Sequence, residues 1–151
     1  MPSTPNAATL GLLRDEVQRR LPDFLTDLET IVDIESGSYT KAGVDEVATW
    51  MAERLAGLGA TIERHPNDEL GDNIVATFEG SPGGPTILLI GHADTVFDPG
   101  YLARRPFGID DDRILGPGVS DMKSGLLTGL YAIDAVRAGA GDGPLPFGRL
   151  I

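Results

Sequence analysis

The sequence contains no cysteine. Disulfide bonds, thiolate nucleophiles and cysteine-based zinc sites are therefore excluded for this chain. Histidine is scarce as well, because only His65 and His92 occur, and a site with three histidine ligands is excluded. Any zinc ion bound by this chain would need histidine and carboxylate ligands, which are typical of catalytic rather than structural zinc sites.

Basic residues are few, with 12 Lys and Arg against 23 Asp and Glu, and the net charge is -11. This charge repels nucleic-acid backbones and anionic membrane surfaces, so we expect neither as a partner. Long hydrophobic runs are missing too, since the apolar stretch at residues 87–90 is too short to cross a bilayer. The first residues carry no basic cluster followed by an apolar run, which predicts no secretory signal and a cytoplasmic location.

The composition that is present fits one globular domain, with 41% hydrophobic residues in 151 positions. Apolar residues recur at three- and four-residue intervals in four segments, which predicts four helices. These segments are residues 10–20, 23–32, 44–58 and 123–136. Pro22 is expected to interrupt the first helix, and Asp23 to cap the second. Residues 1–8 are polar and contain proline, which predicts a disordered lead-in.

Strand patterns occupy the segments between these helices. They cover residues 61–65, 73–78, 86–90 and 113–115, and another begins near residue 147. Residues 86–90 are almost continuously apolar, which predicts a central strand covered on both faces. The order of elements predicts an α/β fold, a layered sheet flanked by helices. In such folds functional groups gather at the carboxyl ends of the strands.

His92 and Asp94 follow directly after the segment expected to be the central strand. If the backbone stays extended, the two side chains project to the same side. A carboxylate beside an imidazole can fix its tautomer and raise its basicity, as it does for many metal-bound histidines. The tripeptide alone is a weak signal, because a surface histidine near an aspartate is common.

Asp121 lies in a second cluster, at the start of the last expected helix. Two glycines and a proline, at residues 116–118, predict an irregular loop there. Asp121 either caps the helix, or the loop directs it toward the strand end that carries His92. Residues 118–122 fall short of a serine-hydrolase nucleophile elbow, because Met122 replaces its last glycine. Ser36-Gly37-Ser38 is expected to be only a helix terminus, and His65 only a surface residue.

Taken together, three ordered motifs resemble the opening signature of the M20 metallopeptidases. They are Gly71-Asp72-Asn73-Ile74-Val75, Gly91-His92-Ala93-Asp94-Thr95-Val96 and Gly116-Pro117-Gly118-Val119-Ser120-Asp121-Met122-Lys123-Ser124-Gly125. The resemblance covers about residues 20–151 and is strongest to the carboxypeptidase G2-like glutamate carboxypeptidases. Acetylornithine deacetylases and succinyl-diaminopimelate desuccinylases are similar in outline.

The resemblance implies a role for each matched residue. His92 would be a ligand of one zinc ion, Asp94 would orient its imidazole, and Asp121 would bridge two zinc ions. The peptide bond between Asp121 and Met122 is expected to be cis. Cobalt or manganese would also suit such ligands. The implied reaction is hydrolysis of an amide bond next to a carboxylate-bearing residue, in a small peptide or N-acyl amino acid, by an enzyme that forms a homodimer at full length.

One departure from the family pattern limits this expectation. The Glu-Glu pair that supplies the general base in the family is absent, as are its remaining zinc ligands and its dimerisation domain. We therefore expect residues 9–151 to be the amino-terminal part of a catalytic domain that is inactive alone and binds zinc weakly. Two alternatives stay open: a non-catalytic binding module that keeps the fold, and an unrelated α/β enzyme in which His92 and Asp121 lie far apart.

Overall fold

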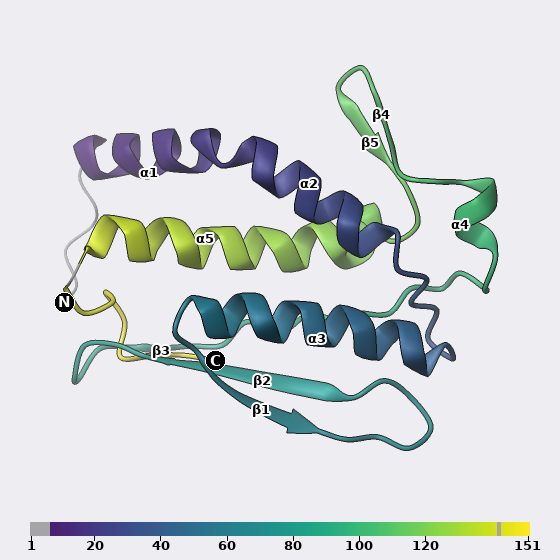
Figure 1. Cartoon of the computed structure of the whole chain (residues 1–151). Helices are drawn as coiled ribbons and strands as arrows, with labels where there is room; N and C mark the ends of the chain where they lie inside the picture. The colour runs from purple at the N-terminus through teal and green to yellow at the C-terminus, as the bar shows by residue number, and fades with distance from the viewer. Residues whose placement is uncertain (1–6, 142) are drawn as a thin grey trace.

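The computed structural model describes residues 7–141 and 143–151 (Figure 1). Its helices are α1 (Ala7–Arg19), α2 (Leu21–Val32), α3 (Lys41–Gly57), the short α4 (Tyr101–Arg104) and α5 (Ser124–Ala140). A π-helical segment, η1 (Val119–Lys123), leads directly into α5. The four long helices expected from the apolar periodicity are therefore present. None of the described helices is long and apolar enough to cross a membrane.

The beginning of the chain differs from expectation in two respects. Most of the expected lead-in lies outside the described residues, but Ala7 and Ala8 already belong to α1, in keeping with the high helix propensity of alanine. Pro22 does not precede the second helix but lies in its first turn. That position tolerates proline, since its missing N–H would have no partner within the helix.

A four-stranded sheet forms the second layer, in the order β1-β2-β6-β3. Its strands are β1 (Thr61–His65), β2 (Asn73–Glu79), β3 (Thr86–Ile87) and β6 (Arg149–Leu150). β1 and β2 are antiparallel, and β6 runs antiparallel to β2 and parallel to β3. A separate hairpin pairs β4 (Gly108–Asp110) with β5 (Arg113–Leu115).

The expected central strand at residues 86–90 is wrong in its position and extent. Only Thr86 and Ile87 are paired as a strand, and β3 lies at the edge of the sheet. The segment was expected to be covered on both faces, but its apolar side chains are exposed: Leu88 is 61% exposed and Ile90 82% exposed. An apolar composition indicates that a segment is more stable when buried, but it does not determine which strands pair with it. In the described part of the chain, β6 and Ile151 are the neighbours that β3 has.

The long helices lie on one side of the sheet, as Figure 1 shows. α3 packs on β1 and β2, while α1 and α2 pack on α5. One apolar cluster joins α2, α3 and α5, with Leu28, Ile31, Met51 and Leu127 at its centre. A second joins the sheet to α5 through Phe78, Leu150 and Ile133. α5 is therefore fixed between helices and sheet, and this fixes where its amino-terminal end lies.

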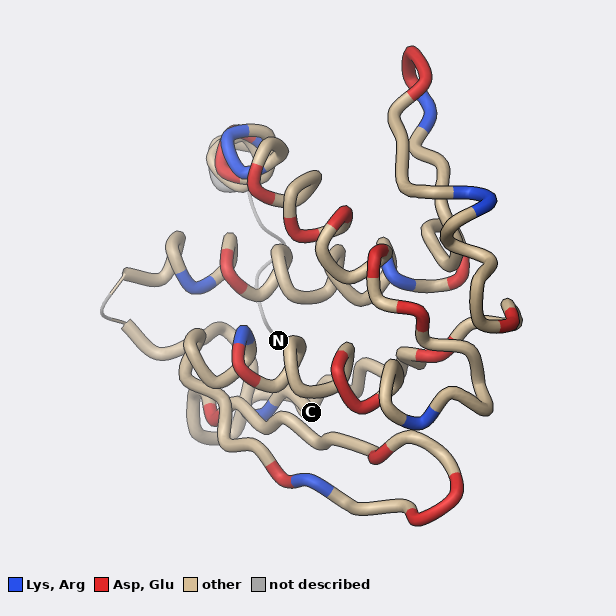
Figure 2. Tube along the Cα trace, turned by 45° about the vertical axis from the view of Figure 1, so that its right-hand side comes forward, with Lys and Arg blue, Asp and Glu red and all other residues tan. Residues whose placement is uncertain are grey.

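Acidic residues are spread along the helices and loops, and Figure 2 shows no single element that gathers them. One ionic cluster lies beside β2, where Asp72 meets Lys41 and Arg64, each at 2.7 Å. Hydrogen bonds from these two cations hold the pKa of Asp72 well below its usual range. The cluster ties α3 to the loop before β2, and its basic groups neutralise a carboxylate close to the candidate site.

Candidate metal centre

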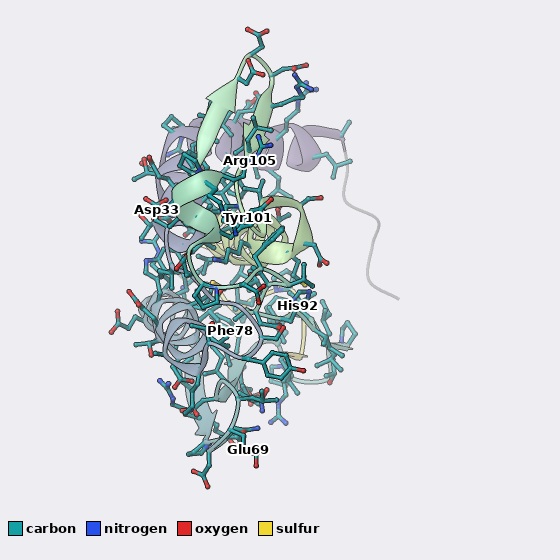
Figure 3. The ribbon with its side chains drawn as sticks, turned by 90° about the vertical axis from the view of Figure 1, so that its right-hand side faces the viewer. Asp33, Glu69, Phe78, His92, Tyr101 and Arg105 are labelled. Atoms are coloured by element: carbon teal, nitrogen blue, oxygen red, sulfur yellow. The ribbon has the colours of Figure 1, made fainter. Side chains whose placement is uncertain are left out.

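His92 and Asp121 come together at the surface, although 29 residues separate them in the sequence. The Nε2 atom of His92 lies 3.0 Å from an Oδ1 oxygen of Asp121. His92 comes from the segment that follows β3, and Asp121 from η1. In Figure 3 His92 lies between Tyr101 above and Glu69 below. The half-exposed imidazole and the exposed carboxylate are open to a solute ion.

Asp94 lies on the opposite side of the same imidazole. The Nδ1 atom of His92 is 3.1 Å from an Oδ1 oxygen of Asp94 and 3.1 Å from the backbone oxygen of Asp94. Both oxygens can only accept, and so can the Asp121 carboxylate that faces Nε2, so all of these contacts together are made by the doubly protonated imidazolium. Burial lowers the pKa of His92, but the hydrogen bonds to Asp121 and Asp94 outweigh it, and the pKa is raised. When the ring is neutral, the two acceptors at Nδ1 favour the proton there over the one acceptor at Nε2, and the Nε2 lone pair then faces Asp121.

The backbone of η1 directs Asp121 toward His92. Gly118 begins the segment at φ 76°, in the left-handed region that favours glycine. A Cβ at this position would lie 2.5 Å from Cγ2 of Thr95, so the close approach also requires glycine. Asp121 has a non-helical backbone, and its peptide bond to Met122 is cis, as the family resemblance implied. Its side chain makes no capping hydrogen bond described for η1; instead it meets His92.

Ser36-Gly37-Ser38 is more than the helix terminus that the sequence suggested. The Ser38 hydroxyl donates to an Oδ2 oxygen of Asp94, and the Ser36 hydroxyl donates to the backbone oxygen of Ala93. α2 has already ended at Val32. No local pattern of residues indicates this contact, because Ser38 and Asp94 are 56 residues apart.

Lys123 is a second residue that sequence reasoning missed. Its side chain is only 1% exposed, and its Nζ atom donates to the backbone oxygens of Ile31 and Ile34, each at 2.7 Å. Burial lowers the pKa of Lys123 to about 8. The two carbonyls lie at and just beyond the end of α2, where helix carbonyls lack partners within the helix. Lys123 therefore joins α2 to the segment that carries Asp121.

Replacing Lys123 with Met is expected to lower the free energy of unfolding by about 2–4 kcal/mol, because two buried carbonyls lose their donor. Urea unfolding followed by circular dichroism measures this change. Lys41→Met is the matched control, since Lys41 is 35% exposed and its ion pairs are near the surface; it should cost about 1 kcal/mol or less. Equal costs for the two variants would contradict the role given to Lys123.

The geometry at His92 and Asp121 fits a shared divalent ion. Nitrogen and oxygen ligands lie about 2.0–2.2 Å from zinc, so two of them at a tetrahedral angle are about 3.4 Å apart, and a shift of a few tenths of an ångström would bring His92 and Asp121 to that separation. The observed separation is 3.0 Å. In the described ranges no group of three or more His, Asp or Glu side chains is placed to hold a metal ion. The described residues thus bring two candidate ligands together, whereas catalytic zinc usually has three from the protein.

A cleft of about 680 Å³ adjoins these residues. Its polar end contains Ser38, Asp72, His92 and Asp94. The rest is mainly apolar and runs between β2, the segment after β3, and helices α3 and α5. His65 lies elsewhere, on β1, with Glu63 at 4.0 Å as the ionic neighbour described for it.

The sequence is similar to known metallohydrolases. The model of peptidase family M20/M25/M40 matches residues 88–147, which include His92, Asp94 and Asp121. Carboxypeptidase G2 of Pseudomonas sp. (strain RS-16) is 35% identical over 118 residues, covering 77% of this chain and 28% of the relative. An acetylornithine deacetylase of Salmonella arizonae is 32% identical over 127 residues, covering 78% and 32%. The chain thus spans less than a third of the length of these relatives.

Solved structures share the fold. Human carnosine dipeptidase 1 superposes with a TM-score of 0.77 at 22% identity, over 97% of this chain and 34% of that protein. A metallo-carboxypeptidase of the M20 family from Sulfolobus solfataricus gives a TM-score of 0.64 at 19% identity, over 84% and 29%. The α/β layered fold predicted from the sequence is confirmed. Residues 88–147 thus match peptidase family M20/M25/M40, the relatives support the same similarity, and the two solved structures, both under 25% identical, show the fold alone.

Proposed function

We propose that this chain supplies part of the metal centre of a zinc-dependent hydrolase that cleaves amide bonds. The observation that carries the proposal is the contact of His92 with Asp121 on one side and with Asp94 on the other. An imidazole backed by a carboxylate and facing a second carboxylate is an arrangement that suits a divalent cation. The match of this segment to a peptidase family supports the same reading.

Each residue has a distinct task in the proposal. His92 would hold zinc through Nε2, and Asp121 would hold it through its carboxylate. Asp94 holds the proton on Nδ1 and keeps the ring in position. Bound zinc would polarise the scissile carbonyl and acidify water. Cobalt or manganese would be accepted by the same ligands.

The substrate class follows from what the relatives have in common. Their names describe a carboxypeptidase, a dipeptidase and deacetylases. Each of these names describes hydrolysis of an amide bond, so we propose small peptides or N-acyl amino acids as substrates. A cytoplasmic location and a homodimeric full-length protein belong to the same proposal.

The 151 residues contain no Glu-Glu pair, and the family resemblance assigns the general base to that pair. We therefore expect the isolated chain to show no turnover. The direct measurement is release of amino acid from N-acyl amino acids and dipeptides, with and without added zinc. Robust turnover that requires zinc would contradict the expected inactivity, although it would support the hydrolase assignment.

A chimera tests the hydrolase assignment itself. In it, the chain replaces the matching segment of the Pseudomonas carboxypeptidase G2, which supplies the rest of a full-length protein. Turnover by the chimera should depend on His92 and Asp121 and should survive His65→Ala. A folded, zinc-loaded chimera whose turnover is unaffected by His92→Ala would show that the assigned residue has no part in the reaction. A folded chimera that binds zinc through His92 without turnover would favour a binding module.

A further inference from the structure

The segment Ser36-Gly37-Ser38 lies along residues 93–95 as a short parallel pairing. The backbone N–H of Ser38 donates to the oxygen of Thr95 at 2.9 Å, and the N–H of Thr95 donates to the oxygen of Ser36 at 2.7 Å. Gly37 pairs with Thr95, and a Cβ on Gly37 would collide with the backbone oxygen of Phe97. Ser36 and Thr95 are buried, at 1% and 5% exposure. The backbone that carries Ser38 is therefore fixed relative to Asp94.

The Ser38 hydroxyl has two acceptors within reach but only one proton to donate. One acceptor is the Oδ2 oxygen of Asp94, and the other is the backbone oxygen of Thr95 at 3.2 Å. The Thr95 oxygen already accepts the N–H of Ser38. Hydrogen bonds to a carboxylate are shorter and roughly twice as strong as those between neutral groups. The proton therefore goes to Asp94.

This hydrogen bond determines which oxygen of Asp94 faces His92. With Oδ2 occupied by Ser38, Oδ1 accepts from Nδ1 of the imidazole. Without the hydroxyl, the carboxylate of Asp94 could rotate about χ2, a broad torsion with no strong preference. The imidazole would then keep only the backbone oxygen of Asp94 as a fixed acceptor.

We propose that Ser38 is a positioning residue: its hydroxyl fixes the Asp94 carboxylate, which holds the proton of His92 on Nδ1 and leaves Nε2 for the metal. The inference rests on the proposed function, because it gives Ser38 a task at the same metal centre. Ser38 itself does not contact the ion. It contacts Asp94, which lies on the opposite side of the imidazole from Asp121.

The test compares three variants of the whole chain. Ser38→Ala removes the hydroxyl that reaches Asp94, whereas Ser36→Ala removes a hydroxyl from the same segment that reaches only a backbone oxygen. Ser38→Thr keeps a hydroxyl at the position. Two properties are measured for each: the tautomer of His92 in zinc-free protein, from imidazole ¹⁵N shifts at alkaline pH, and the dissociation constant for zinc chloride.

Ser38→Ala is expected to weaken zinc binding about 10-fold. This is the lower end of the range of about 10–100-fold seen when residues that hydrogen-bond to metal ligands are mutated. It should also shift the His92 nitrogen signals toward a mixture of tautomers. Ser36→Ala should leave the His92 nitrogen signals unchanged and the zinc dissociation constant within about twofold of the wild-type value. Ser38→Thr should retain most of the wild-type behaviour. Unchanged His92 signals in Ser38→Ala, or equal changes in both alanine variants, would overturn the proposal. The tautomer measurement needs no zinc, so failure of the metal assignment would be seen separately.

Discussion

The affinity of this chain for zinc is expected to fall by more than about 100-fold when His92 is replaced with Ala. Mutation of a residue that only hydrogen-bonds to a metal ligand already lowers metal affinity by about 10–100-fold. Among the described residues, His92 is the histidine that lies near Asp121, and its Nε2 atom faces that carboxylate at 3.0 Å. Binding by the wild-type chain should itself be weak, because two protein ligands replace the usual three. Isothermal titration calorimetry with zinc chloride measures both affinities.

His65→Ala is a matched control, because it removes the other histidine from an exposed position on β1. It should bind zinc as the wild type does. Asp121→Asn should resemble His92→Ala, because it replaces a charged ligand with a neutral amide of similar size. A loss in His65→Ala equal to the loss in His92→Ala would mean that the chain binds zinc nonspecifically at its surface.

Self-association of the chain is the second large effect that we expect. Leu88, Leu89 and Ile90 are 61%, 53% and 82% exposed, and they follow β3 at the edge of the sheet. An apolar segment beside an unpaired strand edge pairs readily with other chains, and charged side chains prevent this. The variant carrying both Leu88→Lys and Ile90→Lys should be mainly monomeric, while the wild type forms dimers and larger species.

Light scattering coupled to size-exclusion chromatography measures the masses of these species. Leu12→Lys is the control, because Leu12 is 73% exposed on α1, away from the sheet edge. It should leave the association of the wild type unchanged. A clean wild-type monomer at concentrations where the proteins are compared would contradict the expectation.

The helices could be predicted well because the apolar period of a helix is a local property. Residues 44–58 showed one apolar face, and α3 covers Lys41–Gly57. The exposed position of residues 88–90 could not be predicted in the same way. Composition indicates what a strand prefers to contact, but the order of strands in a sheet depends on long-range pairing.

At the site, the resemblance singled out His92, Asp94 and Asp121, and the structure places their side chains in contact. The tripeptide around His92 alone was too common to decide between a surface pair and a functional one. Ser38 and Lys123 had no signal in the sequence, because their partners lie 56 and about 90 residues away. Ser38 contacts Asp94, and Lys123 contacts the end of α2. Contacts between residues so far apart in the chain can be seen only in the folded structure.

A crystal of the chain grown with zinc would show whether His92 and Asp121 share a metal ion, through an anomalous difference map at the zinc absorption edge. We expect a peak about 2.0–2.2 Å from both Nε2 of His92 and a carboxylate oxygen of Asp121. A peak at His65 alone, or a zinc-bound structure in which His92 and Asp121 have moved apart, would contradict it.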